Sequence, residues 1–342
     1  MVYEIDPLHD DRWVPFLEKH RMASVFHGRE WLSALQQTYG YNVGALTTSG
    51  PGEALTNAVV FCRVRSWLTG PRLVSLPFSD HCAPLFETEE QLDLLLCHLK
   101  QQCDRETEQY FEIRSAAKGA RGMANSASFC LHRIDLRPDL TELSDALHGS
   151  CIRRKIARAQ REGVAYAEGT SEEILSEFYR MVVLTRRRHR VPPQPLSWFR
   201  NLISCMGDRV KIRLASYKGQ PAAGILTIRY KATMTYKYGC SESQFHRFGP
   251  MQFLMWKAIQ EAKSDGLVEF DMGRTDLSNE GLLTFKDHWG GARSTLTYMR
   301  YPEPRIQRTS ESAAFHVAQS LVPLTPARLL ARAGNILYQH ID

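Results

Sequence analysis

Alternating apolar and polar residues mark three consecutive strands in the second half of this chain. The alternation covers residues 210–215, 223–228 and 234–238, and turn residues such as Lys218, Gly219 and Pro221 separate the first two runs. A period of two residues bounded by turns predicts antiparallel strands, because successive side chains of a strand point to opposite faces. We therefore predict an antiparallel sheet at the centre of this half.

A helix and a further strand follow this sheet. Pro250 occupies the expected first helical turn, Phe253, Leu254, Trp256, Ile259 and Ala262 recur at helical spacing, and Gly266 provides a stop. Residues 267–272 then read as a strand that ends at Gly273 and Arg274. The order predicts a mixed α/β unit with its site where the strands splay, beside the start of the helix.

The first half of the chain repeats this order of elements. Apolar runs at 43–46, 58–62 and 73–78 precede a leucine-rich helix at 89–102 and a strand at 110–114, in which Glu112 corresponds to Asp271. We predict a duplicated α/β fold with two tandem domains and mixed, mostly antiparallel sheets flanked by helices. The expected bounds are 1–140 and 141–301, followed by a partly helical tail at 302–342.

Composition indicates a globular protein with an anionic partner. The 342 residues are 43% hydrophobic and 23% charged, with a net charge of +6. The eight cysteines include no CxxC pair, so we expect reduced, mostly buried thiols and no metal site. The sequence shows no opening apolar run typical of a signal peptide and no span of transmembrane length, so we expect a cytoplasmic protein.

The positive charge is concentrated in two segments. One is a predicted amphipathic helix at 151–162 that contains Arg154, Lys155 and Arg158; the other, 185–190, contains Arg187, Arg188 and His189. Clustered cations favour a phosphate or diphosphate ligand, which arginine engages through two hydrogen bonds. The alternatives are a solvated helix face and a helix end favoured by the dipole. His189 is a candidate general base without a visible partner.

Four segments resemble one known family. They are residues 76–85 (LPFSDHCAPL), 153–163 (RRKIARAQREG), 185–195 (TRRRHRVPPQP) and the FK–WG element formed by Phe285, Lys286, Trp289 and Gly290. The chain resembles the FemAB-like members of the GNAT acyltransferase superfamily, in the group found near exopolysaccharide genes, which carry two copies of the GNAT fold.

The resemblance implies transfer of an acyl group onto an amine to form an amide. In the best understood relatives the donor is an aminoacyl-tRNA, the acceptor is a peptidoglycan precursor, and the lysine matching Lys286 belongs to the donor site. Phe285 and Trp289 flank that lysine here. The long helical arm thought to hold tRNA in some members is absent from the second domain, which weakens the tRNA assignment.

Further candidates come from the predicted strands. Tyr236 and Tyr238 are expected on one face of a strand, where they line a substrate groove or pack in the core. Asp271 lies near Arg274 in the sequence. The two residues form a structural ion pair, or Asp271 acts as a base for the incoming amine with Arg274 as its neighbouring cation.

The turn before the helix at Pro250 tests for coenzyme A. GNAT enzymes that use coenzyme A hold its pyrophosphate on backbone amides of a [QR]-x-x-G-x-[GA] turn. The corresponding HRFGPM at 246–251 keeps only Gly249, and Pro250 removes an amide donor. A donor other than acetyl-CoA is therefore favoured, and no bound cofactor is expected beyond the donor substrate, either aminoacyl-tRNA or acyl-CoA.

These observations favour a FemAB-like acyl- or aminoacyltransferase acting on an amine of a cell-wall, polysaccharide or peptide acceptor. One alternative is an acyl-CoA-dependent N-acyltransferase. Another is a non-catalytic RNA-binding protein, although no base-stacking aromatics interleave the charges. A third is a membrane-surface protein that uses residues 321–338, which Pro323 and Pro326 interrupt.

Overall fold

The computed structural model describes residues 1–66, 70–105, 108–115, 122–303 and 337–338. The chain forms two compact units. Among the described residues, the first comprises residues 1–129, 295–303 and 337–338, and the second comprises residues 130–294. The polypeptide passes between the units along two long strands, β6 (Ala124–Asp135) and β12 (Ala292–Tyr301).

The first unit is a sheet with helices. Its elements in chain order are β1 (Tyr3–Ile5), α1 (Trp13–Lys19), η1 (Val25–His27), α2 (Arg29–Tyr39), β2 (Asn42–Thr47), β3 (Val59–Ser66), β4 (Gly70–Ser75), α3 (Glu89–Asp104) and β5 (Tyr110–Ser115). Strands β1 to β4 pair antiparallel, β4 pairs parallel with β5, and β5 pairs antiparallel with the end of β12. Leu95, Leu96 and Leu99 of α3 pack on Phe61 and Phe111 of the sheet.

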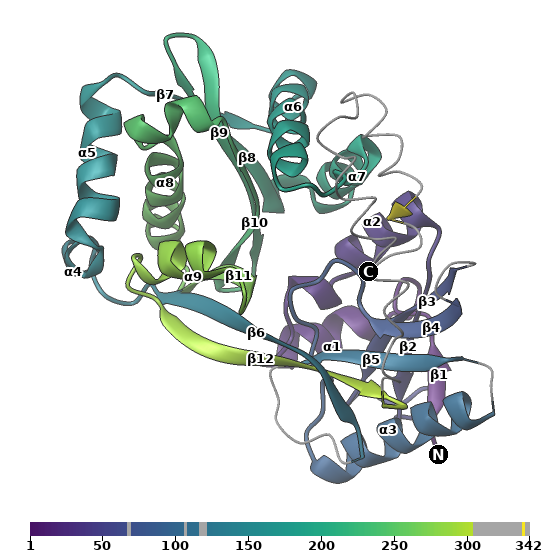
Figure 1. Ribbon diagram of the computed structural model, residues 1–342. Helices are drawn as coiled ribbons and strands as arrows, with labels where there is room; N and C mark the ends of the chain where they lie inside the picture. Colours follow the sequence, from purple (N-terminus) through teal and green to yellow (C-terminus); the bar gives the residue numbers. More distant parts are fainter. Residues whose placement is uncertain (67–69, 106–107, 116–121, 304–336, 339–342) are drawn as a thin grey trace. The chain divides into compact units, whose positions relative to one another are not determined.

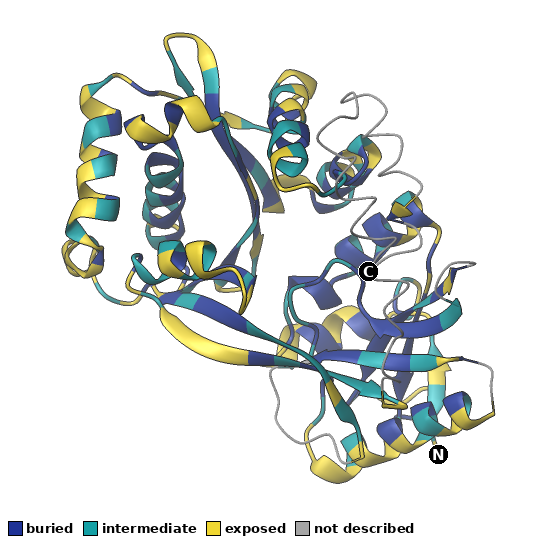
Figure 2. Cartoon of the chain, viewed as in Figure 1, coloured by how far each residue is buried: buried dark blue, intermediate teal, exposed yellow. Residues whose placement is uncertain are grey.

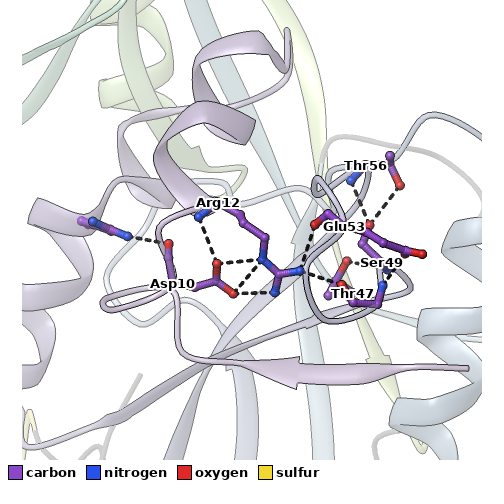
Figure 3. Close-up of polar contacts among 8 residues, drawn as sticks. Asp10, Arg12, Thr47, Ser49, Glu53 and Thr56 are labelled. Atoms are coloured by element: carbon purple, nitrogen blue, oxygen red, sulfur yellow. Dashed lines mark hydrogen bonds and ion pairs between the residues drawn. The ribbon is translucent and has the colours of Figure 1, made fainter.

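An arginine at the start of α1 ties this helix to the loop between β2 and β3 (Figure 3). The guanidinium of Arg12 donates to both carboxylate oxygens of Asp10 and to the carbonyl oxygens of Gly50 (2.8 Å) and Glu53 (3.0 Å). Ser49 and Thr56 close the loop, since the Ser49 hydroxyl accepts from the Thr56 N–H at 3.1 Å. Because each nitrogen of the Arg12 guanidinium has an internal acceptor, we interpret this network as structural.

The second unit is a sheet covered by helices on both faces. Its remaining elements are α4 (Leu140–Ala146), the π-helical turn η2 (Gly149–Arg153), α5 (Arg154–Arg161), β7 (Ala165–Gly169), α6 (Glu172–Arg188), α7 (Leu196–Met206), η3 (Gly207–Arg209), β8 (Val210–Tyr217), β9 (Gln220–Tyr230), β10 (Thr233–Ser241), η4 (Ser243–Phe248), α8 (Pro250–Ser264), β11 (Glu269–Asp276) and α9 (Glu280–Asp287). Strands β7 to β10 pair antiparallel, and β10 pairs parallel with β11.

Each face of this sheet buries its own apolar layer. Helices α5 and α8 lie on one face, and α6 and α7 lie on the other (Figure 1). The α8 layer includes Phe253, Leu254 and Ile259, whereas Phe178 of α6 and Trp198 of α7 are fully buried on the opposite side. The strands between the two layers are mostly buried (Figure 2). Burial on both faces fixes the register of these strands.

The predicted elements of the second half are confirmed. The three alternating runs are β8, β9 and β10, the helix begins at Pro250, and the next strand is β11. The α/β fold class with a mixed, mostly antiparallel sheet is also confirmed, and five of the eight free cysteines are buried. The predicted tail falls almost entirely outside the described residues. No helix in the described ranges is both long and apolar enough to cross a membrane.

Candidate functional site

The candidate site lies in the second unit, where two parallel strands separate. The ladder between β10 and β11 joins residues 233–235 to residues 269–271, while β10 continues to Ser241 and β11 to Asp276. Parallel strands place their carboxyl ends at the same edge of a sheet. The functional side chains described below extend from these two ends and from α5, α6 and α9.

Lys286 of α9 is buried against the end of β11. Its ammonium donates to the carbonyl oxygens of Gly273 (2.7 Å) and Arg274 (3.1 Å), and the residue is only 2% exposed. Burying a charge requires such partners, because desolvation of an unpaired ammonium is costly. Lys286 is therefore a buried, hydrogen-bonded lysine and not an ordinary surface lysine.

Asp271 shapes the backbone that holds Lys286. Its Oδ1 atom accepts the Gly273 N–H at 2.7 Å, and Oδ2 lies 3.9 Å from Nε of Arg133 on β6. Gly273 has a φ of 70°, in the left-handed region that glycine enters without steric cost. The glycine thus offers its N–H to Asp271 and its carbonyl oxygen to Lys286, and it links the two predicted residues.

The end of α9 is fastened to β6 by Asp287, the residue after Lys286. Asp287 accepts from Nε2 of the buried His132 at 3.0 Å and pairs with Arg293. The hydrogen bond from Arg293, followed by that from His132, lowers the pKa of Asp287 to about 2. Burial lowers the pKa of His132. These contacts fix the position of the helix that carries Lys286.

The two basic segments converge on the loop that follows β10. Arg188, at the end of α6, donates to the Ser241 carbonyl oxygen at 3.0 Å, and Lys155 of α5 donates to the His246 carbonyl oxygen at 3.4 Å. The Ser241 hydroxyl and Nε2 of His246 lie 2.8 Å apart, and Thr185 accepts the Ser241 N–H at 3.0 Å. The structure thereby joins segments that are far apart in the sequence into one basic cluster, which we define as Lys155, Arg188 and His246.

Two histidines in or beside this cluster favour the neutral form. Desolvation, followed by the positive charges of Arg188 and Lys155, lowers the pKa of His246. Desolvation and the charges of Arg188 and Arg186 lower the pKa of His189, which is exposed beyond the end of α6. The neighbouring cations contribute to both shifts after desolvation, and a bound anion would oppose that contribution.

The remaining predicted cations differ in their surroundings. Arg158 lies over the Phe248 ring, with Cζ 5.5 Å from the ring centroid, and its Nε is 3.5 Å from Glu162. Arg154 is exposed, and Arg187 and Arg274 are half-buried. Arg158 therefore has a packing role on η4, whereas Arg154 remains available at the surface.

The expectation that Tyr236 and Tyr238 share one face is wrong. The pairing of β10 with β9 shifts register between these two residues, as it does at a β-bulge. Tyr236 packs against the apolar layer of α8, whereas the Tyr238 hydroxyl accepts from the Trp198 indole of α7 at 2.7 Å. One extra residue in the strand therefore sends the two rings to opposite sides of the sheet.

The aromatic residues beside Lys286 are part of the core. Trp289 is 1% exposed, and Phe285 meets it edge to face with ring centroids 6.1 Å apart. Phe285 is half-buried and packs against the α8 layer. Both side chains hold α9 in place.

The turn before α8 offers few amides for a pyrophosphate. The N–H of Gly249 already donates to the His246 carbonyl oxygen at 3.2 Å, and Pro250 has no N–H. A Cβ atom on Gly249 would lie 2.5 Å from the Lys155 carbonyl oxygen, so α5 closely approaches this turn. These contacts agree with the sequence-based interpretation against a coenzyme A turn.

Sequence reasoning missed three residues of this site. His246 and Ser241 carry the contacts of the basic cluster, and His132 fastens α9, yet each is a single polar residue in an apolar or loop segment. A cue for His246 was its place beside Gly249 and Pro250, at the start of the central helix.

Known proteins share a domain family and the fold with this chain. Residues 150–287 match the family described as acetyltransferase (GNAT) domain. Comparison with curated protein sequences gave no match. The fold is similar to a crystal structure of FemX (TM-score 0.67, 13% identity, 93% of this chain and 100% of that chain). It is also similar to L-PGS from Bacillus licheniformis (TM-score 0.56, 15% identity, 96% of this chain and 98% of that chain). A tandem GNAT protein from the clavulanic acid biosynthesis pathway is similar as well (TM-score 0.55, 10% identity, 89% of this chain and 100% of that chain).

These matches bear on two expectations. The GNAT-type α/β fold is confirmed, and the family match lies in the second half of the chain, where an acyltransferase domain of this kind was expected. The solved structures share the fold at low identity, so they supply no residue roles for this chain.

Proposed function

We propose that this chain, which carries an acyltransferase domain of the GNAT family in residues 150–287, moves an acyl or aminoacyl group from an anionic carrier to an amine. The product is an amide on a cell-wall, polysaccharide or peptide acceptor. The observation that carries the proposal is the placement of Lys286 and the basic cluster at the carboxyl ends of adjacent strands β11 and β10.

The proposed reaction has one bond made and one broken. The amine nitrogen attacks the carbonyl carbon of the donor ester, and the carbonyl oxygen becomes an oxyanion. The C–N bond forms, the C–O bond to the carrier breaks, and the carrier oxygen takes the proton that the amine gives up. Placing amine and ester together removes much of the entropic barrier of this bimolecular step.

Lys286 supplies positive charge to this step. A buried ammonium held by two carbonyl oxygens is preorganised, and preorganised charge stabilises an oxyanion more strongly than solvent does. Asp271 then has a positioning role, because its Oδ1 atom already holds the Gly273 N–H. His189 is the proposed base, since its lowered pKa keeps the ring neutral at pH 7.

The carrier is bound by the basic cluster with Arg154 and Arg187. Arginine at a helix end suits a phosphate or diphosphate, through charge-assisted hydrogen bonds. A tRNA backbone and a nucleotide-linked acceptor share this chemistry, and tRNA is the carrier that we propose for the donor. Arg274, which is half-buried at the end of β11, has the remaining proposed contact with substrate. Our proposal places the enzyme in the cytoplasm, where free cysteines stay reduced. The segment 321–338, through which membrane contact was expected, falls almost entirely outside the described residues.

A second candidate is acyl-CoA-dependent N-acyl transfer. The description of the matched family as an acetyltransferase domain favours it. The engaged Gly249 amide and the proline at position 250 weigh against it.

A binding and transfer comparison tests the choice of donor. The full-length protein is incubated with aminoacyl-tRNA or acetyl-CoA, each with a panel of amino-sugar and peptide amines. The products are identified by mass spectrometry. We expect aminoacyl transfer and no acetyl transfer. Acetylated amine as the main product would replace the proposal with the coenzyme A alternative, and tRNA binding without turnover by either donor would support the non-catalytic alternative.

A further inference from the structure

Three metal-binding side chains converge where α9 ends and η2 begins. They are His148, Cys151 and His288, and one ligand atom from each lies within 4.8 Å of the other two. His148 caps the start of η2, and His288 caps the end of α9. The cluster therefore joins two segments that are far apart in the sequence.

The backbone holds these segments together without any metal. The His148 N–H donates to the His288 carbonyl oxygen at 2.9 Å, and the two imidazole rings lie with centroids 4.3 Å apart. Gly290 has a φ of 72°, and a Cβ atom there would lie 2.9 Å from the Ala146 carbonyl oxygen. The convergence is thus preorganised, which lowers the entropic cost of binding a ligand.

The donor set selects one class of ion. One thiolate and two imidazoles suit Zn²⁺ and similar transition metals, whereas Ca²⁺ and Mg²⁺ prefer oxygen ligands. Bonds of about 2.0 Å to nitrogen and about 2.3 Å to sulfur place tetrahedral ligand atoms about 3.5 Å apart. Cys151 and His288 are half-buried and His148 is exposed, so side-chain rotation can close the remaining distance of about 1 Å.

The hydrogen bonds at His148 indicate which nitrogen faces the cluster. Nδ1 accepts the Cys151 N–H at 3.2 Å and lies 3.4 Å from the Ser150 hydroxyl, which is itself 3.7 Å from the Cys151 sulfur. The lone pair of Nδ1 is therefore directed toward the segment that carries the thiol. A metal bound at Nδ1 would replace the 3.2 Å hydrogen bond from the Cys151 N–H with a coordinate bond.

We propose that His148, Cys151 and His288 bind a zinc-class divalent cation, with a fourth position open to water. The bound ion links the end of α9, two residues beyond Lys286, to the turn η2. That turn leads into α5, which carries Arg154 and Lys155. The rival interpretation is that His148 only caps η2 and stacks on His288. This inference does not depend on the identity of the acyl donor.

Cobalt titration tests the site directly. Untagged full-length protein is reduced, stripped with a chelator and titrated with Co²⁺, and bound Co²⁺ is then displaced with Zn²⁺. We expect one equivalent of Co²⁺, a thiolate-to-cobalt charge-transfer band and the visible bands of a tetrahedral ion. Cys151→Ser removes the charge-transfer band and weakens binding by about 100-fold or more, because loss of a ligand exceeds the effect of losing an outer partner. His288→Gln weakens binding similarly.

Cys205→Ser is the matched control, because Cys205 is also half-buried and lies in the same unit, on α7. It keeps the stoichiometry and the spectrum of the wild type. Circular dichroism of each variant checks the fold, and the wild-type titration stands even where a variant fails to fold. A wild-type protein that shows no charge-transfer band overturns the proposal. So does weak binding of several equivalents that Cys151→Ser leaves unchanged.

Discussion

The ammonium of Lys286 lies 2.7 Å from the carbonyl oxygen of Gly273, and this contact connects α9 to the strand that carries Asp271. Gly273 reaches both partners because its φ is positive. The relationship makes a buried lysine part of the sheet edge where we place the reacting carbonyl. It also explains the position of Lys286 on a short helix, because α9 brings the ammonium to the Gly273 carbonyl oxygen.

Lys286→Ala should abolish most of the acyl transfer. Loss of a preorganised donor costs about 100- to 1000-fold in turnover in comparable sites. We expect a fall in kcat of that size for the donor that the transfer assay identifies. Lys263→Ala is the control, because Lys263 also donates to a backbone carbonyl oxygen, that of Arg137 at 2.9 Å, but lies at the far end of α8. A folded Lys286→Ala protein with full activity contradicts the assigned role.

Arg188→Ala should weaken binding of the anionic carrier. A hydrogen bond to a charged group contributes about 1.5–3 kcal/mol, so the KM for the carrier should rise about 10- to 100-fold. The salt dependence of carrier binding should become less steep, because one phosphate contact is lost. Arg180→Ala provides the comparison on the same helix, since Arg180 pairs with Glu177 and Glu242. Equal effects of the two substitutions would show that only general charge matters.

Carrier binding should tighten as the pH falls below about 6.5, the ordinary pKa of histidine. In the free protein, desolvation, Arg188 and Lys155 lower the pKa of His246. The phosphodiesters of a bound tRNA oppose those charges and raise this pKa, so binding takes up a proton and affinity increases toward acid. Calorimetry in two buffers of different ionisation enthalpy measures the uptake.

His246→Asn should remove part of the proton uptake. His189 shares Arg188 as a neighbour and has a similarly lowered pKa, so His189→Asn should remove a separate part. Uptake that persists unchanged in both variants would place the anion elsewhere.

The first unit should lose stability in acid through His27. Nδ1 of His27 accepts the Ser24 N–H at 3.1 Å, Nε2 donates to the Ala83 carbonyl oxygen at 2.9 Å, and burial lowers the pKa of the ring to about 4. The unfolded chain protonates this ring near pH 6.5, so stability is full above that pH and is lost as the pH falls from 6.5 to about 4.

The expected loss is about 3 kcal/mol of the free energy of unfolding across this window. Urea unfolding of the wild type and of His27→Gln at pH 7.5, 5.5 and 4.5 measures it. The substitution should lower stability at pH 7.5 and flatten the pH dependence. A wild type equally stable at all three pH values would show that the ring is not held neutral.

Local patterns sufficed for much of the second unit. Period-two alternation identified β8, β9 and β10, and Pro250 identified the start of α8, because each signal depends on neighbours a few residues away. The same local rule failed at Tyr238, where a register shift in β10 reversed the face of the ring. A bulge is decided by the partner strand, which a single strand's pattern does not contain.

The sequence by itself determined the order of helices and strands and the concentration of cations in two segments, and its resemblance to a known family singled out Lys286 as a candidate. Only the tertiary structure decided that Arg188 and Lys155 contact Ser241 and His246 of one loop, that Gly273 holds Lys286, and that Cys151 lies near His148 and His288. The physical reason is range: periodicity and capping act within a few residues, whereas these contacts form when packing brings distant segments together.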